Sequence, residues 1–348
     1  MNNFKKDLRL LSFQEIYQLF AINGEPAFRA KQVYDWLWKK HILSFDKMKN
    51  IPAKTIKYLD KNFKINPISI LSFKKSNDKT IKTTFQLFDS KIIEGVLIPT
   101  ENRTTACVSS QVGCSLSCEF CATGKLGWTR NLDFPEIFDQ VMMINQQSQK
   151  TLGKPISNIV FMGMGEPLLN YNNVLKAIEL LTSPDIFNFS PGRITISTVG
   201  IIKMIKQLAD DHVKFNLAIS LHAATDKKRS LIMPVNENNS LKNLAEALKY
   251  FHFKTKTRIT LEYLILDKFN DSLDDAQDLA NYCKNFPCKI NIIEYNPIEN
   301  GIYKNASKNK EKAFIDFLKS KNLIVNIRKS KGKDIAAACG QLAYKENI

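Results

Sequence analysis

Three cysteines within one short stretch, Cys114, Cys118 and Cys121, are the residues of this chain best suited to chemistry. Their spacing, C-x3-C-x2-C, lets a single loop present three thiolates to one side of a metal centre. A structural zinc ion takes four tetrahedral ligands, whereas a cubane iron–sulfur cluster has four irons that usually take one cysteine each. Without a fourth ligand nearby, the spacing predicts a cubane with one iron open to a small molecule. A zinc site whose fourth ligand lies far away in the sequence is the alternative.

Composition indicates a globular protein with a polyanionic partner. The chain has 348 residues, 44% of them hydrophobic, and a formal net charge of +16. That length allows one large domain or two ordinary ones, and the apolar content allows a core without disulfides. The charge favours nucleic acid as partner, and an anionic membrane surface second. A lysine-rich proteome is the alternative explanation.

The sequence also predicts where the protein resides. No stretch approaches the roughly 20 apolar residues that span a bilayer, and the N-terminal residues lack the features of a signal peptide. We therefore expect a cytoplasmic protein with no membrane partner. Seven cysteines in such a protein indicate metal or redox chemistry rather than structural disulfides.

Residues 1–90 are expected to form an N-terminal accessory module. Apolar spacing predicts helices near residues 13–20, 26–41 and 54–63. The second of these mixes aromatic and basic side chains, so it could contact RNA or be an ordinary amphipathic helix with a solvated basic face. Alternating residues at 80–88 and 91–99, joined by Asp89-Ser90, predict an antiparallel pair of strands.

From about residue 103 onward, short apolar strands alternate with helices. Such βα repeats predict an α/β fold with a parallel sheet and right-handed crossovers, here an open, partial (βα)6 barrel. Functional residues of such folds gather at the carboxyl ends of the strands, and the three-cysteine loop follows the first strand. We assign residues 91–335 to this core and 336–348 to a C-terminal segment. Expected strands are 103–108, 157–163, 193–198, 213–220, 258–265, 288–294 and 323–328, and expected helices are 134–148, 171–183, 201–211, 240–252, 272–285 and 308–321.

Polar residues at several strand ends predict a ligand pocket. The strand expected at 157–163 runs into the glycine-rich turn Gly163-Met164-Gly165-Glu166, where the backbone can approach a ligand and the carboxylate could hold an ammonium group. Later strands end at Ser197, at Ser220-Leu221-His222 and at Asn296. Taken alone, each is typical of a turn or a cap. Together they predict one pocket, in which His222 is expected to form hydrogen bonds.

Two further thiols and one acid deserve a separate hypothesis. Cys107 ends the first strand of the core, and Cys339 lies among small residues that would let a bulky partner approach. Glu94 lies inside an apolar stretch, either on the solvent face of a strand or at a functional site. Cys283 and Cys288 are expected to be inert core residues.

These motifs resemble a known superfamily. Cys114, Cys118 and Cys121, with Phe120 before the last cysteine, look like the signature of radical S-adenosylmethionine (radical SAM) enzymes, and the turn at residues 163–167 resembles their Gly-Gly-Glu element. With the stretch from Cys107 to Cys114 and the segment 338–342, the chain is similar to the RlmN/Cfr family of RNA adenine methyltransferases. The resemblance extends from about residue 24 to residue 342.

The resemblance implies cofactors and site roles. It implies a [4Fe-4S] cluster bound by the three cysteines of the signature, and S-adenosyl-L-methionine (SAM), two molecules per turnover, on the open iron. Cys339 stands where the family carries its methylated cysteine, Cys107 where it carries the resolving thiol, and Glu94 matches a proposed proton acceptor. The positions where the family contacts SAM are Gly165, Glu166, Ser197, Ser220, Leu221, His222 and Asn296.

The implied reaction has two stages, because an adenine ring carbon is too poor a nucleophile for direct methylation. A first SAM methylates Cys339. A radical made from a second SAM then takes hydrogen from this methyl group, which adds to the ring. Glu94 or Cys107 removes the ring proton, and Cys107 attacks the sulfur of Cys339, so that a disulfide forms as methylated RNA leaves.

The resemblance also implies partners. Family members act on carbon 2 of the adenosine at position 2503 of 23S rRNA, and some on position 37 of tRNA. We expect the rRNA as a protein-poor assembly intermediate, an electron donor of flavodoxin or ferredoxin type, and a monomeric enzyme. The stretches 165–170 and 221–225 look more like the carbon-2 branch than the Cfr branch, which modifies carbon 8 and confers antibiotic resistance. Carbon-8 methylation and a non-catalytic, metal-bound RNA-binding protein are the two alternatives.

Overall fold

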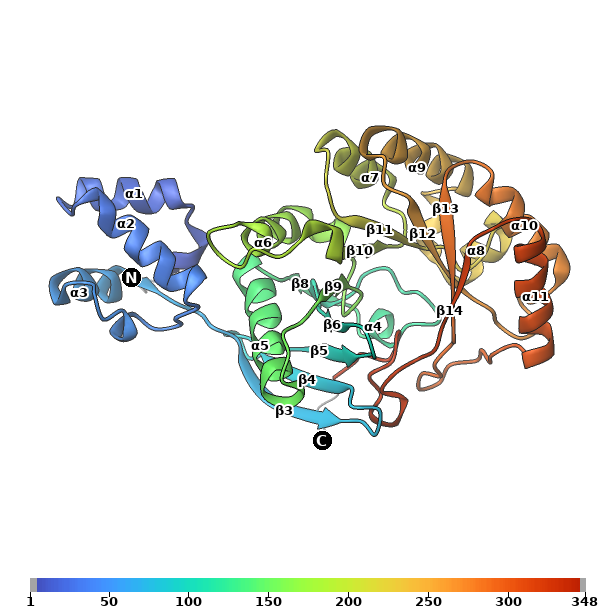
Figure 1. Cartoon of the computed structure of the whole chain (residues 1–348), viewed down its shortest axis with the longest axis horizontal. Helices are drawn as coiled ribbons and strands as arrows, with labels where there is room; N and C mark the ends of the chain where they lie inside the picture. The colour runs from blue at the N-terminus through green and yellow to red at the C-terminus, as the bar shows by residue number, and fades with distance from the viewer. Residues whose placement is uncertain (1–4, 345–348) are drawn as a thin grey trace.

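The computed structural model describes residues 5–344, which form a small helical module set apart from a larger α/β body (Figure 1). The body is built on one ten-stranded sheet with the order β14-β13-β12-β11-β10-β9-β6-β5-β4-β3. No helix in this part of the chain is long and apolar enough to cross a membrane.

Three helices make up the N-terminal module. α1 (Phe13–Ile22) begins with a capping box, in which Ser12 and Glu15 bond each other's backbone amides. α2 (Ala27–Tyr34) and α3 (Ala53–Asn62) each follow a proline. The helix expected over 26–41 begins as α2 and continues directly as a π-helical turn, Asp35–Lys39, where it ends. The short strands β1 (Lys6–Asp7) and β2 (Phe63–Lys64) pair in parallel and close the module.

A buried ion-pair network joins this module to the body. Arg9 Nη1 bonds both carboxylate oxygens of Asp139 on α5, at 3.0 and 2.8 Å, and Arg9 also pairs with Asp7. His41 Nε2 lies 2.8 Å from the same Asp139 carboxylate. The Arg9 and Asp139 side chains are 1% and 0% exposed, so neither has water as an alternative partner. Beside them, Trp38 stacks on Phe134 with a ring-centroid distance of 5.7 Å.

The first strands of the sheet are antiparallel. β4 (Ile81–Gln86) and β5 (Ile92–Pro99) form the hairpin expected from the sequence, and β5 pairs with β6 (Thr104–Cys107). The edge strand β3 (Ser69–Lys75), which the sequence analysis missed, extends this sheet. Since β3 and β4 belong to the same sheet as the core, we propose that the accessory module ends before β3 rather than at residue 90.

The parallel part confirms the α/β fold class and the partial barrel. From β6 to β14 every neighbouring pair is parallel, and the helices form an arc outside the strands (Figure 1). The expected strands and helices of the core are all present, and α8 is an addition. The strands are β9 (Asn158–Phe161), β10 (Ile194–Thr198), β11 (Asn216–Ser220), β12 (Ile259–Leu264), β13 (Cys288–Ile293) and β14 (Val325–Arg328). The helices are α5 (Phe134–Leu152), α6 (Tyr171–Thr182), α7 (Ile202–Asp210), α8 (Asp226–Ile232), α9 (Leu241–Thr255), α10 (Leu273–Cys283) and α11 (Lys308–Ser320). Short 3-10 turns occupy Leu8–Leu10, Phe45–Lys47, Pro167–Asn170, Pro191–Arg193, Pro234–Glu237 and Lys333–Ile335.

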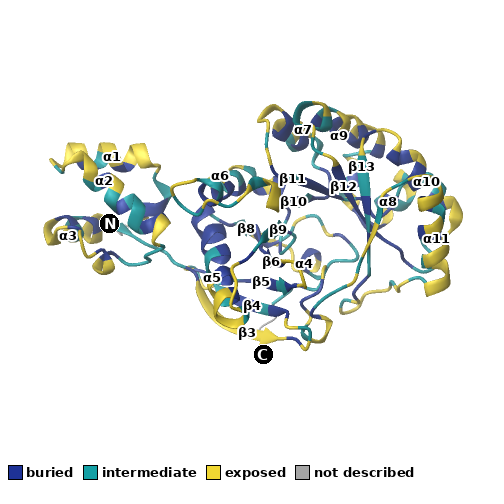
Figure 2. Cartoon of the chain, in the orientation of Figure 1, coloured by how far each residue is buried: buried dark blue, intermediate teal, exposed yellow. Residues whose placement is uncertain are grey.

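The two faces of the parallel sheet differ in chemistry. Apolar residues such as Ile196 and Leu261 point outward and pack under the helices, whose inner sides are buried (Figure 2). The register places polar residues on the opposite face, because Ser220 pairs with Glu262 and Ile293 pairs with Arg328. Successive strand residues point to opposite faces, so the inner face is polar along several neighbouring strands.

Candidate active site at the carboxyl ends of the strands

A cavity at the carboxyl ends of the parallel strands collects most of the predicted site residues. Its wall combines the cysteine loop, the ends of the six strands β9 to β14, and the C-terminal segment. Leu221, Glu94 and Cys107 lie outside this wall. The predicted residues that line the cavity are Cys114, Cys118, Cys121, Gly165, Glu166, Ser197, Ser220, His222, Asn296 and Cys339.

A two-stranded clamp shapes the cysteine loop. β7 (Gln111–Gly113) and β8 (Trp128–Asn131) pair antiparallel at its base, and Cys114 N donates to Gly127 O at 2.8 Å. Gly113 has φ +75°, and a Cβ atom there would lie 1.9 Å from Gly127 O. Only glycine fits this position, so the loop is closed directly beside the first cysteine. A single helical turn, α4 (Ala122–Lys125), follows the last one.

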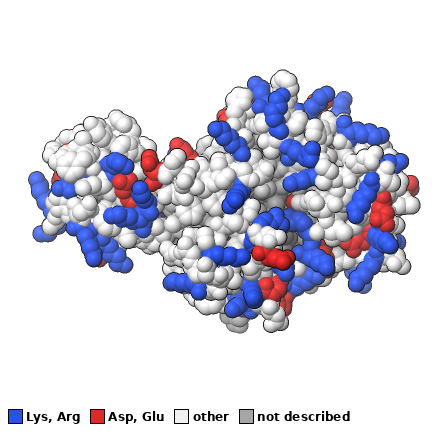
Figure 3. Space-filling view, in the orientation of Figure 1, with Lys and Arg blue, Asp and Glu red and all other residues white. Residues whose placement is uncertain are grey.

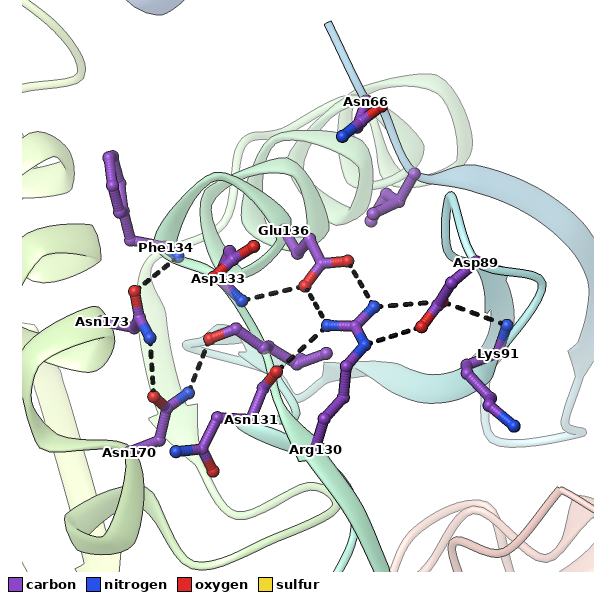
Figure 4. A network of polar contacts seen from close by, with 12 residues as sticks. Asn66, Asp89, Lys91, Arg130, Asn131, Asp133, Phe134, Glu136, Asn170 and Asn173 are labelled. Carbon is purple, nitrogen blue, oxygen red and sulfur yellow. Dashed lines mark hydrogen bonds and ion pairs between the residues drawn. The ribbon is translucent and has the colours of Figure 1, made fainter. Parts of the chain in front are cut away.

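Arg130 anchors the base of the loop to the body, as Figure 4 shows. Its guanidinium bonds Asp89 at 2.8 and 3.1 Å and Glu136 at 2.8 and 2.9 Å. Glu136 also accepts from Asp133 N at 2.9 Å, within the capping box of α5. The two carboxylates raise the pKa of Arg130, so β8 is tied to α5 and to the β4–β5 turn by a permanent cation.

The three thiols of the loop fit a cluster. All three are free and face one cavity. Burial raises the pKa of Cys114 to about 11, and it raises that of Cys118, as do the charges of Cys121 and Cys114. Thiolates held together in this way need a cation. Within residues 5–344 no group of three His, Cys, Asp or Glu side chains could hold a single metal ion. A cubane binds each cysteine through a different iron, so its ligands need not converge on one point.

The glycine-rich turn places a buried carboxylate opposite the cysteine loop. Gly165 has φ +94°, and a Cβ there would come within 2.4 Å of Gln111 Cβ. Glu166 Oε2 accepts from Val199 N at 2.9 Å, and Oε1 accepts from Leu168 N at 3.0 Å. Burial raises the pKa of Glu166 to about 7, although these hydrogen bonds lower it. The carboxyl group therefore changes charge near neutral pH and would be stabilised as an anion by a ligand's ammonium group.

His222 is held as a neutral hydrogen-bonding residue. Its Nδ1 lies 3.2 Å from Leu264 N, which donates to it, and Phe120 packs edge-on at 4.5 Å between ring centroids. Burial, with help from the Arg229 cation, lowers the pKa of His222 to about 3. With Nδ1 accepting, the ring proton sits on Nε2. Leu221, next to it, is fully buried and donates its backbone N–H to Glu262 O.

The C-terminal segment is fixed so that Cys339 faces the cavity. Asn296 Nδ2 donates to Cys339 O at 3.2 Å. Ala122 N donates to Gly340 O at 2.7 Å, and Thr123 Oγ1 donates to Leu342 O at 2.6 Å. These bonds join the segment to β13 and to the cysteine loop. Cys339 is exposed to solvent on one side. Protein atoms on its other sides partly bury the thiol and thereby raise its pKa.

Neither Cys107 nor Glu94 lines the main cavity. Cys107 lines a second, smaller cavity that shares Cys339, Met162 and Arg328 with the main one. Glu94, on β5, is 2% exposed, and its Oε1 lies 3.0 Å from Lys82 Nζ. Its other oxygen, Oε2, has no hydrogen-bond partner among the described residues. The structure thus brings the two lone thiols to one place, whereas Cys283 and Cys288 line neither cavity.

Three charged residues near the site were missed from the sequence. Glu262 and Arg328 line the main cavity, and Lys82 bonds both Glu94 and the backbone oxygen of Ala336. The signal was clearest for Glu262, which stands between Leu261 and Tyr263 in a strand, where alternation would have placed it on one face. Only the curvature of the sheet shows that this face is the interior.

Comparison with known proteins agrees with this geometry. Residues 108–281 match the radical SAM superfamily, and residues 6–65 match a ribosomal RNA large subunit methyltransferase N-terminal domain. The chain is 52% identical to a probable dual-specificity RNA methyltransferase RlmN of Flavobacterium johnsoniae, over 98% of both chains. It is 43% identical to that of Salinibacter ruber, over 97% of this chain and 94% of the relative. A crystal structure of a radical SAM methyltransferase from Sphaerobacter thermophilus superposes with a TM-score of 0.91, at 35% identity, over 97% of this chain and 99% of that one.

Fold and site together define a radical SAM enzyme, which uses a [4Fe-4S] cluster and SAM. The chain belongs to the RlmN family of RNA methyltransferases. The predicted family, enzyme class and cofactors are thereby confirmed, and RNA is the substrate class.

Proposed function

We propose that this enzyme methylates carbon 2 of an adenosine in 23S rRNA, and also in tRNA, through a methyl group carried on Cys339. The observation that supports this most directly is the shared cavity wall, where Cys339 stands between the cysteine loop and Cys107. The similarity to relatives named dual-specificity RNA methyltransferases supports two kinds of RNA substrate.

The residues around the cavity divide the work. When bound, the cluster and SAM supply the methyl group and the radical that activates it. Cys114, Cys118 and Cys121 would hold the cluster. SAM would be held by Leu221, from outside the cavity wall, and by six residues that line the cavity: Gly165, Glu166, Ser197, Ser220, His222 and Asn296. Glu166 offers an anion to the amino group, and His222 offers a neutral ring.

Three side chains would act on the substrate. Cys339, whose backbone is fixed by Asn296, carries the methyl group. Glu94 has one carboxylate oxygen without a partner, which suits it to accept the ring proton. Cys107 then forms a disulfide with Cys339 as the product leaves, because the two thiols line the same cavity.

The RNA would be held largely through its phosphates. The net charge of +16 supports this, as do the Lys and Arg side chains that flank the hollowed centre of the face in Figure 3. The target base must leave its stack to reach the cavity, which favours a protein-poor rRNA assembly intermediate. The module before β3 would bind RNA, and a flavodoxin- or ferredoxin-type protein would supply electrons to a monomeric enzyme.

Anaerobic reconstitution with iron and sulfide, followed by reaction with rRNA and tRNA fragments, tests the proposal. Mass spectrometry of the digested RNA should show 2-methyladenosine with wild type and none with Cys339→Ala. Finding only 8-methyladenosine would establish the carbon-8 alternative instead. Methylation that survives Cys339→Ala would remove Cys339 from the reaction.

A further inference from the structure

Arg328 is the last residue of β14 and lines the same cavities as the two thiols, but it has no part in the proposed reaction. It lines the main cavity beside Cys339 and the second cavity beside both Cys339 and Cys107. Among the described residues that line the main cavity, it is the only lysine or arginine. Its position follows from the register, because Arg328 pairs with Ile293, which also lines both cavities.

A chain of polar side chains fixes the Arg328 guanidinium. Nη1 donates to both carboxylate oxygens of Glu262, each at 3.2 Å. Asn291 Nδ2 donates to Glu262 Oε1 at 2.8 Å, and Asn326 Nδ2 donates to Asn291 Oδ1 at 3.1 Å. In residues 5–344, Arg328 Nε and Nη2 have no acceptor. Their N–H groups are therefore available to an anion in the cavity.

The two thiols are the groups that need such a donor. Burial raises the pKa of Cys107 to about 12, and the charge of Cys339 adds to the rise. Burial also raises the pKa of Cys339, while Arg328 lowers the pKa of both thiols. Arg328 therefore opposes the effect of burial on both thiols, although its side chain is 39% exposed and water screens part of its charge.

Other charged groups around Cys339 do not replace Arg328. Glu262 and Glu294, which share the main cavity, and Cys107 and Cys121 would repel a thiolate. Lys329 and Lys331 share the second cavity with both thiols, but unlike Arg328 they do not line the main cavity, and Lys331 is already 3.9 Å from the carboxylate of Asp78.

We propose that Arg328 is a positioning residue that stabilises the thiolate of Cys339, and in turn that of Cys107, with Glu262 orienting its guanidinium. The thiol proton leaves to solvent, and the negative charge on sulfur is met by the free N–H groups of Arg328. This inference rests on the proposed function, since it assigns Arg328 to the two thiols named there. It explains how an arginine belongs in a cavity otherwise rich in anionic groups.

The test measures the reactivity of Cys339 without any methylation. The full-length, cluster-loaded enzyme is treated anaerobically with iodoacetamide from pH 6 to pH 10, and alkylation of the peptide that carries Cys339 is followed by mass spectrometry. Because neither SAM nor RNA is present, the outcome does not depend on whether carbon 2 is the methylated atom.

Arg328→Gln should alkylate more slowly than wild type near pH 7.5, and its pH profile should shift to higher pH, because less of the Cys339 thiol is ionised without the cation. The difference should narrow as pH rises towards 10, because the ionised fraction then grows in both proteins. Glu262→Gln should alkylate at least as fast as wild type, because its amide oxygen can still accept from Arg328 Nη1 while the substitution removes a repelling charge. An unchanged pH profile in Arg328→Gln, or equal slowing in both variants, would overturn the proposal.

Two further variants separate the electrostatic effect from general damage. Lys329→Gln removes the same charge from an exposed neighbour that does not line the main cavity, and its profile should match wild type. If it slows alkylation as much as Arg328→Gln does, the assignment to Arg328 is wrong. The double variant Arg328→Gln/Glu262→Gln leaves no unpaired buried charge, and it should still alkylate more slowly than Glu262→Gln alone.

Discussion

Replacing Arg9 by methionine should loosen the joint between the N-terminal module and the body. Methionine is a long, apolar side chain that can fill much of the same space, but it leaves the carboxylates of Asp139 and Asp7 without their cation. The two aspartate side chains are 0% and 5% exposed, respectively. Removing one partner of a buried ion pair costs about 3–5 kcal/mol. This corresponds to about two to three and a half orders of magnitude in the folded-to-unfolded ratio, since about 1.4 kcal/mol is tenfold.

The dependence of this loss on pH distinguishes an unpaired charge from lost packing. Burial alone would raise the pKa of Asp139, but Arg9 and then His41 hold it below its usual value. In the wild type, this carboxylate therefore contributes stability above its unfolded pKa and loses it as pH falls through the folded value. Without Arg9, burial prevails and the pKa rises. Protonation then removes the uncompensated charge, so the difference between variant and wild type should shrink on acidification from pH 7 towards pH 5.

Urea unfolding followed by tryptophan fluorescence measures the effect, because Trp38 stacks on Phe134 at this joint. Arg193→Met, which removes an exposed arginine from the body, is the matched control and should change stability by less than about 0.5 kcal/mol. Arg9→Met/Asp139→Asn should recover part of the loss. A destabilisation below about 1 kcal/mol, or one that does not change with pH, would refute the reasoning.

Four further predictions concern the site. Cys339→Ala should abolish turnover while the cluster's visible absorbance is retained; loss of both would mean that the residue is structural. Cys107→Ala should trap RNA on Cys339, visible as a slower-migrating species on a denaturing gel, and its absence would remove the resolving role. Gly113→Ala should lower the iron content per chain, since a Cβ would lie 1.9 Å from Gly127 O. The control Gly153→Ala should not, because Gly153 also has a positive φ, +67°, but nothing lies within 4 Å of its Cβ position. Equal losses in the two variants would exclude the clash as the cause. SAM affinity, measured by calorimetry, should fall about tenfold per pH unit below about 7 as Glu166 takes up a proton. Glu166→Gln should flatten this dependence on pH. A wild-type affinity independent of pH would contradict the role of Glu166 in binding the amino group of SAM.

Sequence patterns predicted most of the fold because local physics sets them. The capping boxes at Ser12 and Asp133 mark where α1 and α5 begin, and short apolar stretches identified the strands of the core. β3 escaped because all of its residues are exposed, so burial imposes no alternation on it. The helix expected over 26–41 is continuous over 27–39, but its spacing did not reveal that the last turn, Asp35–Lys39, is π-helical.

The sequence by itself determined that three thiols lie together on one short loop. Their spacing is fixed along the chain, so they need no distant segment to face the same way. It also determined that polar groups end several strands of a parallel sheet. Only the tertiary structure decided that Cys107 and Cys339 line one cavity. Their meeting depends on the bonds that hold residues 336–342 against α4 and β13. Only the tertiary structure likewise showed that Arg328 lines the cavities of both thiols, because the curvature of the sheet brings these residues together. Contacts between residues far apart in the chain arise from packing of the whole body, which no local spacing encodes.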